Sequence, residues 1–547
     1  MAAIIHAKSH LRRIWPFNDE TQICVSTPPL MPPTTYRILH RNDYRHGRYR
    51  LLPIRPDDRE AIRQWRNAQL DILRQSTPLT AEAQDRYFRE VVVPLFDAEQ
   101  PGQLLFSLLL DEKLIGYGGL VHIDWNAGRA EISFLLETGR NAHVPTFQTD
   151  FAAYLHLLRQ VAFKDLSLQK INTEAYDVRP YLTAVLEAEG FVEEARLPRH
   201  VQVAGQLVDT VFHSCFRPTG TFRGHVLVTS LAGKAPLLRA VQAAARRLHY
   251  ATRVLGADLN PQALARPLAD DFWLMPALHD EALPELLAGL QARGIAYLIP
   301  TRDGELAFWS RHRAALATAG VAVLVSAPEA VHRCLDKLEF AAFGQQYGLP
   351  VIATSDTLTA LIGHHPATTF VVKERHGAGS LSLGLNLPQA TALAHARTLH
   401  EPVFQPFIQG REISVDGYVG RAGRVHGLVA RTRDVVVRGE SQVTSTLPDA
   451  ALLARLAPIV ARLGLYGPFV LQALLTDDGG LHLIECNCRF GGASTLGIAA
   501  GVDSFYWFLQ EAGGADLQAF PFVPTAGPLR QVRVASDFIQ HGPLAAV

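Results

Sequence analysis

The chain has few cysteines, no excess of either charge and no long apolar run, and each of these shortages excludes a class of protein. Its 547 residues include only Cys24, Cys215, Cys334, Cys486 and Cys488, an odd and scattered set that predicts a reducing, cytoplasmic compartment rather than a disulfide framework. Lys+Arg and Asp+Glu both number 52, so no global positive field favours nucleic-acid binding. No apolar stretch reaches the roughly 18 residues of a membrane span, and we expect no membrane association.

The length of the chain predicts several globular units. At about 150 residues per domain, three or four folding units are expected. Residues 1–34 contain several prolines without sustained periodicity and predict a disordered leader. Cys486 and Cys488 would share one face of a strand, and we expect them to be buried thiols rather than zinc ligands.

Residues 35–217 mix strand and helix patterns. Leu104–Leu110 and Leu114–His122 predict a hairpin, Phe147–Phe163 predicts a helix, and two strands around Gly205 close the unit. This mixture is typical of an α+β domain.

Residues 224–330 alternate strands with helices more regularly. His225–Ser230 is a short apolar strand, and Ala235–Leu248 predicts the helix that follows it. Such alternation indicates a parallel sheet. The fold class that we expect for the whole chain is therefore α/β and α+β multidomain.

A lysine at the end of a predicted strand precedes a glycine-rich loop. Lys373 follows three apolar residues, and Gly377, Gly379 and Ser380 come shortly afterwards. Glycines let backbone N–H groups approach phosphate oxygens without a Cβ in the way, and the lysine adds a point charge. The pattern indicates phosphate binding, although a hairpin turn shares it.

Residues 404–412 predict a strand end, a linker and a second strand. The linker backbone at Phe407 and Ile408, after Gln405, can pair with the edge of a base. Glu412 can accept ribose hydroxyl groups. An ordinary loop with a solvated Glu412 fits the same residues.

Three oxygen-donating side chains fall on two neighbouring predicted strands. Glu485 and Asn487 share a strand face, and Gln472 lies on the preceding strand across a turn at Asp477–Gly480. One carboxylate and two amides suit Mg²⁺ (or Mn²⁺) that bridges phosphates. Arg489 continues the same face and can neutralise a transferring phosphoryl group. A solvated polar face is the alternative, but the neighbouring apolar residues would make an unpaired Glu485 costly.

Taken in order, these segments resemble the ATP-grasp ligases, in the branch of the carbamoyl phosphate synthase large subunit and the carboxylate–amine ligases. The resemblance covers about residues 224–515, and Ile299–Leu306 and Asp336-Lys337 also match segments of that family. Cys488 stands where many relatives have proline, which leaves the metal ligands intact. The resemblance implies a pre-ATP-grasp domain at 224–330, an ATP-grasp domain at 331–515 and a peripheral tail at 516–547.

The resemblance also implies an activity and a set of site residues. A substrate carboxylate would attack the γ-phosphate of ATP, and an amine would displace phosphate from the acyl phosphate. Arg489 and Lys373 would be catalytic, and Gln472, Glu485 and Asn487 would hold the metal. The nucleotide would contact Lys337, Lys373, Gly377, Gly379, Ser380, Gln405, Phe407, Ile408, Glu412 and Gln472.

Two other activities stay open for this half of the chain. One is a bicarbonate-using enzyme of the carbamoyl-phosphate type, and the other is a nucleotide-binding regulatory protein without turnover. The partners that we expect are a small carboxylate and a small amine, and a homodimer is left open.

Residues 51–216 resemble the GNAT acetyltransferase family, which implies a GNAT-like domain at 35–217. The resemblance rests on the order of segments such as Leu114–Gly119 and Ala130–Phe134, and it implies that Glu131 can act as a water-mediated base, unless it is a structural strand residue. Gly139–Pro145 lacks the glycines of the family's pyrophosphate loop, and Pro145 has no N–H. A divergent acetyltransferase that binds acetyl-CoA and a fold retained to bind substrate or partners are both left open.

Overall fold

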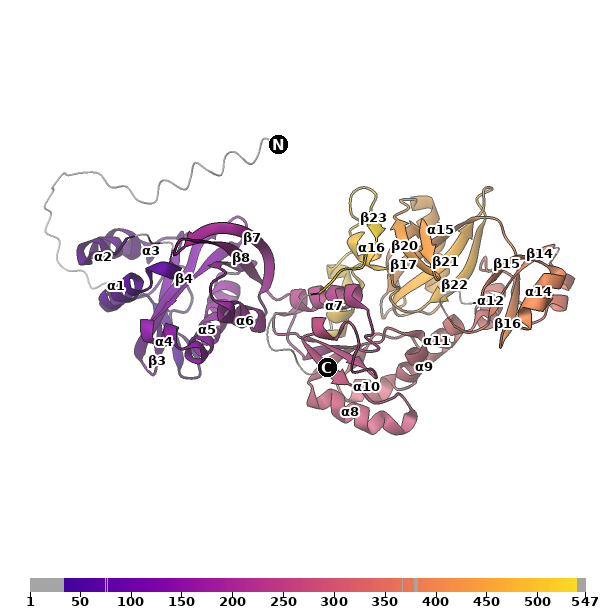
Figure 1. Ribbon diagram of the computed structural model, residues 1–547, viewed down its shortest axis with the longest axis horizontal. Coiled ribbons are helices and arrows are strands. Elements are labelled where there is room, and N and C mark those ends of the chain that lie inside the picture. Colours follow the sequence, from indigo (N-terminus) through magenta and orange to yellow (C-terminus); the bar gives the residue numbers. More distant parts are fainter. Residues whose placement is uncertain (1–33, 74, 76, 366, 378–381, 539–547) are drawn as a thin grey trace. The chain divides into compact units, whose positions relative to one another are not determined.

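The computed structural model describes residues 34–73, 75, 77–365, 367–377 and 382–538 (Figure 1). Contacts divide the chain into two compact units, one containing the described residues up to Trp125 with Ile132–Val161, and the other containing Asn126–Glu131 with the described residues from Ala162 onward. Strands and helices are mixed throughout, which confirms the expected fold class. Across the described part of the chain, no helix combines the length and apolarity that a membrane crossing requires.

The strands between residues 44 and 216 form one eight-stranded sheet in the order β1-β2-β3-β4-β5-β6-β8-β7. The predicted hairpin is confirmed as the antiparallel pair β3–β4, and the predicted strands around Gly205 are β7 and β8. The strands are β1 (Tyr44–His46), β2 (Tyr49–Pro53), β3 (Leu104–Leu110), β4 (Lys113–Asp124), β5 (Arg129–Leu136), β6 (Lys170–Tyr176), β7 (Val192–Val203) and β8 (Gln206–Phe216).

The longest helix of this region packs through aromatic rings. The predicted helix from Phe147 is confirmed as α5, whose Phe151 and Tyr154 stack on Phe134 with ring centroids 4.8 and 4.3 Å apart. The helices are α1 (Arg59–Ala68), α2 (Ala81–Tyr87), α3 (Val93–Leu95), α4 (Thr138–Ala142), α5 (Val144–Arg159) and α6 (Pro180–Ala188).

A five-stranded parallel sheet follows, in the order β11-β10-β9-β12-β13, which confirms the parallel sheet predicted from the alternation of strands and helices. The chain leaves β9 toward one edge and returns to β12 on its other side, so the loops at the carboxyl ends of β9 and β12 meet at a switch point. The strands are β9 (His225–Val228), β10 (Val254–Asp258), β11 (Asp271–Leu274), β12 (Ile295–Ile299) and β13 (Ala322–Val323). The helices are α7 (Ala235–Leu248), α8 (Leu283–Ala292), α9 (Asp303–Arg311), α10 (Arg313–Thr318) and α11 (Pro328–Leu335).

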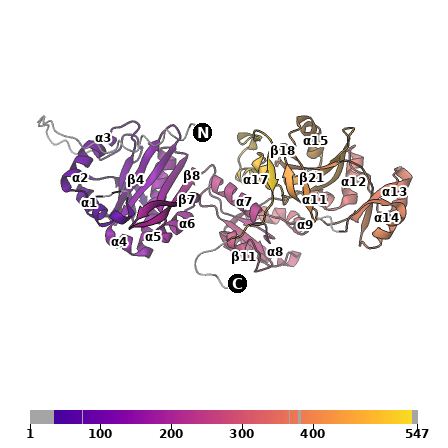
Figure 2. The ribbon, with the colours of Figure 1, turned by 45° about the horizontal axis from the view of Figure 1, so that its top comes forward.

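The next lobe is a three-stranded antiparallel sheet in the order β15-β14-β16. Helices α13 and α14 lie together against it (Figure 2), and residues such as Leu361, Val372 and Ala396 form a small core separate from the main one. The elements are α12 (Lys337–Gln346), α13 (Leu358–His364), β14 (Thr369–Glu374), β15 (Gly384–Pro388), α14 (Gln389–Ala396) and β16 (Pro402–Pro406).

The last region contains a four-stranded antiparallel sheet, β18-β17-β21-β22, and a three-stranded one, β19-β20-β23. The four-stranded sheet shares a hydrophobic core with the parallel sheet, and Cys486 and Cys488 lie in this core with exposed fractions of 1% and 3%, which confirms them as buried thiols. The strands are β17 (Arg411–Val419), β18 (Val425–Thr432), β19 (Val435–Val437), β20 (Glu440–Ser445), β21 (Gly467–Leu475), β22 (Leu481–Asn487) and β23 (Arg530–Val532). The helices are α15 (Ala450–Arg462), α16 (Thr495–Ala499) and α17 (Ser504–Ala512).

Candidate functional site

The three oxygen donors predicted from the sequence meet on β21 and β22. The antiparallel register places Gln472 directly opposite Glu485, and the amide nitrogen of Asn487 donates to Oε1 of Glu485 at 3.4 Å. All three side chains are half-buried, whereas Cys486 between them points into the core. A carboxylate and two amides on one face fit a hard cation such as Mg²⁺. No group of three or more His, Cys, Asp or Glu residues that could hold a metal is found among residues 34–538 as far as they are described.

Lys337 connects this carboxylate to the start of the glycine-rich loop. Its Nζ lies 4.0 Å from Oε2 of Glu485 and donates to the carbonyl oxygens of Arg375 and Gly377 at 3.4 and 3.0 Å. Gly377 has a φ of +104°, and a Cβ added there would meet no atom within 4 Å, so the backbone is open at this point. Gly379 and Ser380, which were predicted to contact the nucleotide, lie outside the described residues.

Asp336 fixes the position of Lys337. One carboxylate oxygen accepts from the backbone N–H groups of Leu338 and Glu339, which caps α12. The same carboxylate binds the guanidinium group of Arg375 at 2.5–3.0 Å. Burial acts to raise the pKa of Asp336, but these donors outweigh it and hold the pKa below its usual value. The Asp-Lys motif therefore joins α12 to the segment that follows β14.

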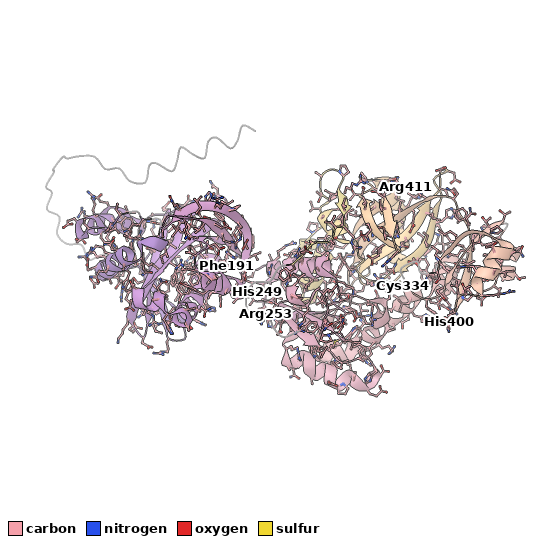
Figure 3. All side chains as sticks on the ribbon, in the orientation of Figure 1. Phe191, His249, Arg253, Cys334, His400 and Arg411 are labelled. Carbon is pink, nitrogen blue, oxygen red and sulfur yellow. The ribbon has the colours of Figure 1, made fainter. Side chains whose placement is uncertain are left out.

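Lys373 is half-buried near the end of β14, and the charges around it shift its pKa in opposite directions. Burial lowers its pKa to about 8, the charge of Lys337 adds to this, and Glu485 and Glu412 act in the other direction. Its neighbour Glu374 serves a structural role, since it accepts from the backbone N–H of His400, labelled in Figure 3, and of Glu401. The structure thus brings Lys373 close to the charges of the proposed metal and nucleotide residues.

The linker between β16 and β17 takes the predicted form of a strand end, a short connection and a second strand. Gln405 is 3% exposed and its amide nitrogen donates to Oγ1 of Thr354 at 2.9 Å. The backbone N–H of Phe407 donates to the carbonyl oxygen of Thr369. Ile408 lies next in the connection, and β17 begins at Arg411 (Figure 3).

Glu412 lies near the start of β17 and faces the same group of charges. Burial raises its pKa, while Arg433, whose Nε lies 3.2 Å from Oε1, acts against this rise. Of the predicted nucleotide residues, Lys337, Lys373, Glu412 and Gln472 are thus brought near Glu485, either by direct contact or through their charges.

Arg489 pairs with a residue that the sequence did not identify as its partner. Its Nε and Nη2 donate to the two oxygens of Asp303, both at 2.6 Å, and the side chains are 18% and 22% exposed. Asp303 is the first residue of α9, which follows β12 of the parallel sheet. This bidentate ion pair joins the switch-point loop to the end of β22.

Glu131 lies half-buried on β5, opposite Asn172 of β6, at the last residue of the parallel register between these strands. Its role as a water-mediated base stays a prediction.

The start of α5, where the family's pyrophosphate loop is expected, is capped by the side chain of His143. Pro145 has no N–H, and the N–H of Thr146 donates to Nδ1 of His143 at 3.4 Å while the hydroxyl of Thr146 lies 2.7 Å from the same nitrogen. The N–H of Phe147 donates to the carbonyl of His143 at 2.9 Å. Of the backbone donors in the first turn, that of Pro145 is therefore absent and that of Thr146 is capped by the chain itself.

Three family models match separate parts of the chain. Residues 51–212 match the acetyltransferase (GNAT) domain, residues 226–324 match the PylC-like N-terminal domain, and residues 398–534 match the family described as ATP-grasp in the biosynthetic pathway with Ter operon. These matches confirm both resemblances drawn from the sequence. A search of curated proteins found no match.

The solved structures that match this chain cover about half of it. The biotin carboxylase domain of 2-oxoglutarate carboxylase from Hydrogenobacter thermophilus is 14% identical over 55% of this chain and 71% of its own, with a TM-score of 0.45. The L-amino acid ligase from Bacillus licheniformis is 18% identical over 56% and 78%, with a TM-score of 0.44. The N5-carboxyaminoimidazole synthetase from Staphylococcus aureus, complexed with ADP, is 14% identical over 55% and 80%, with a TM-score of 0.44.

Proposed function

We propose that this chain, which carries a GNAT acetyltransferase domain, a PylC-like N-terminal domain and an ATP-grasp domain, is an ATP- and Mg²⁺-dependent carboxylate–amine ligase for a small metabolite. The observation that supports this most is the meeting of Gln472, Glu485 and Asn487 on one sheet face, with Lys337 within 4.0 Å of the same carboxylate. Oxygen donors for a divalent cation and lysines for phosphates are the groups that such chemistry requires.

Each residue of the site has a role in this proposal. Lys337 and Lys373 bind phosphate oxygens of ATP, and Glu412 binds the ribose. Gln472, Glu485 and Asn487 would hold Mg²⁺, which would supply positive charge against the phosphates. Arg489 faces the transferring phosphoryl group.

The reaction then needs no covalent protein nucleophile. A substrate carboxylate oxygen attacks the γ-phosphorus, ADP leaves, and an acyl phosphate is formed. The amine attacks the acyl carbon, the bond to phosphate breaks, and an amide and phosphate are released. The protein contributes position and charge neutralisation, and it keeps water away from the acyl phosphate.

The test is ADP release by the full chain with ATP, Mg²⁺ and paired panels of carboxylic acids and amines, including amino acids and amino sugars. ADP release should require both an acid and an amine, and ¹⁸O from a labelled carboxylate should appear in the released phosphate. ADP release that depends on bicarbonate instead would favour the carbamoyl-phosphate type. ATP binding without ADP release under any pair would favour the regulatory protein.

The pKa of Lys373 predicts how ATP affinity depends on pH. ATP binds the protonated lysine, and the free protein loses that proton near pH 8. Affinity should therefore be constant below about pH 7 and should fall as pH rises through 8, by up to about tenfold per pH unit. The measurement is ATP titration between about pH 6.5 and 9.5. The Lys373→Arg variant keeps its charge throughout and should show no such fall; an equal fall in both proteins would assign the titration to another group.

For the GNAT domain we propose a fold that is retained to bind a substrate or a partner and does not take up acetyl-CoA at α5. His143 and Pro145 occupy the helix N-terminus that a pyrophosphate group would need. Calorimetry with acetyl-CoA should therefore give no binding heat, and a His143→Gly, Pro145→Gly variant provides the comparison with an open N-terminus. Micromolar affinity in the unchanged protein would contradict this proposal.

A cytoplasmic location, small-molecule partners and the predicted domain boundaries belong to the same proposal. The four described cysteines are free thiols, which is consistent with a reducing compartment. Whether the chain forms a homodimer stays a prediction.

A further inference from the structure

The last described strand of the chain, β23, lies beside the segment that follows β22. β23 pairs with β20 in an antiparallel register that places Thr444 opposite Gln531. Along this segment the side chains alternate: Gln531 and Arg533 are half-buried, whereas Val532 and Val534 are 57% and 77% exposed. Gln531 and Arg533 therefore share the inward face of the strand.

This inward face contacts the residues that come directly after Arg489. The hydroxyl of Thr495 donates to the amide oxygen of Gln531 at 2.9 Å. A Cβ added to Gly492 would lie 3.3 Å from Nη1 of Arg533 and 3.6 Å from Oε2 of Glu440. The missing side chain at Gly492 thus lets Arg533 and Glu440 approach the backbone that leaves the β22 signature.

Arg533 and Glu440 form an ion pair that leaves part of each charge free. Nη1 of Arg533 donates to Oε2 of Glu440 at 2.6 Å, and the side chains are 28% and 58% exposed. Within residues 382–538, no further partner is seen for Nε or Nη2 of Arg533 or for Oε1 of Glu440. The guanidinium groups of Arg489 and Arg431, in contrast, each contact both oxygens of a carboxylate.

We propose that Arg533 and Glu440 bind the zwitterion of an α-amino acid, and that this amino acid is the amine substrate of the proposed ligase. The free edge of a guanidinium group matches a carboxylate, and the free carboxylate oxygen beside it matches an ammonium group. A plain amine or a plain acid would leave one of the two charges without a match. The inference rests on the proposed function for the role of the bound amino acid, but the binding itself does not depend on turnover.

The first test measures binding to the full chain without ATP. Thermal-shift titrations compare the twenty amino acids with matched probes that lack one charge, such as ethylamine and propionate for alanine. We expect at least one amino acid to stabilise the unchanged protein, and its matched probes to fail. Arg533→Ala and Glu440→Gln should each weaken that binding by roughly 10- to 100-fold, as expected for the loss of charge-assisted hydrogen bonds. If no amino acid binds the unchanged protein, or if both variants bind equally well, the proposal is overturned.

A charge swap separates recognition from a purely structural ion pair. The double variant Arg533→Glu, Glu440→Arg restores an ion pair between β23 and β20, so its thermal stability should return toward that of the unchanged protein. Amino-acid binding should stay weak, because the carboxylate and the ammonium group of the ligand would each meet the wrong charge. Recovery of both stability and binding would show that the pair only ties the two strands together.

Kinetics distinguish a failure of this inference from a failure of the ligase assignment. In the ADP-release assay, Arg533→Ala should raise KM for the amino acid by roughly 10- to 100-fold and leave KM for ATP unchanged. Arg59→Ala is the matched control, since it breaks an exposed 2.6 Å ion pair with Asp85 in the other compact unit and should change neither constant. Amino-acid binding without ADP release would contradict the ligase and support the binding site; ADP release with an unchanged KM in Arg533→Ala would contradict the site alone.

Discussion

Replacing Glu485 by alanine is expected to lower ATP-dependent phosphate release by about 10³-fold or more while the protein stays folded. Glu485 is the one carboxylate in the proposed metal set, and the amides of Gln472 and Asn487 are neutral. A bound metal ion supplies several kcal/mol of charge stabilisation, and about 4 kcal/mol corresponds to about a thousandfold in rate. The test measures phosphate release, the Mg²⁺ concentration that gives the half-maximal rate, and thermal unfolding.

The fold should tolerate the Glu485 change because the side chain is half-buried and contributes no packing to the core on the opposite face of β22. Its loss also removes a negative charge that opposes the effects of burial and of Lys337 on Lys373, so the pKa of Lys373 should fall further. Glu485→Asp retains a shortened carboxylate and should lose less activity.

His482→Ala is the matched control for Glu485→Ala, because His482 is half-buried on the same strand, opposite Leu474 and near the turn. It should retain full turnover. Turnover at the unchanged rate in Glu485→Ala, with an unchanged Mg²⁺ requirement, would show that the metal set is wrongly assigned.

The sequence was sufficient to locate the oxygen donors because their arrangement depends on local geometry. Alternation along β22 separates Glu485 and Asn487 from the buried Cys486, and this separation follows from the two-residue period of a strand. The short turn between β21 and β22 fixes the register of the residues beside it, and a register shift between Ala473 and Gln472 then brings Gln472 opposite Glu485. The parallel sheet was predictable for a similar reason, since four of its five strands are followed by an α-helix.

Contacts between distant segments could not be predicted in the same way. Asp303 and Arg489 are 186 residues apart in the sequence, and no local pattern around either residue indicates that the other is its partner. β23 has three residues, too few for periodicity to reveal a strand, and the prolines before it suggested a peripheral tail. Its pairing with β20 depends on the packing of the whole region, so Arg533 was not identified from the sequence.

The GNAT domain shows that a departure from a motif can be read from the sequence, while its physical result cannot. The missing glycines before Pro145 predicted a poor phosphate site. The structure adds that the side chain of His143 caps the helix, because its Nδ1 accepts a hydrogen bond from the N–H of Thr146. Such a cap depends on the rotamer of one residue, and composition or spacing does not determine it.

Arg489→Ala is expected to lower phosphate release by about 10³-fold or more and also to destabilise the protein. The rate effect follows from the loss of a guanidinium group near a transferring phosphoryl group, which is worth about 10³- to 10⁵-fold in related chemistry. The stability effect follows because Asp303, 22% exposed, loses both of its charge-assisted hydrogen bonds to Arg489. An unpaired, largely buried carboxylate costs about 1–3 kcal/mol.

The double variant Arg489→Ala, Asp303→Ala separates these two effects. Removal of both partners leaves no unpaired charge, so thermal stability should largely recover. Activity should not recover, because the positive charge at the end of β22 is still absent. Asp303→Ala alone leaves Arg489 without its carboxylate but close to the site, and it should retain more turnover than either variant that lacks the arginine. If the double variant regained both stability and turnover, Arg489 would serve only to hold the switch-point loop against β22, and phosphoryl transfer would have to be stabilised by the two lysines and the metal ion.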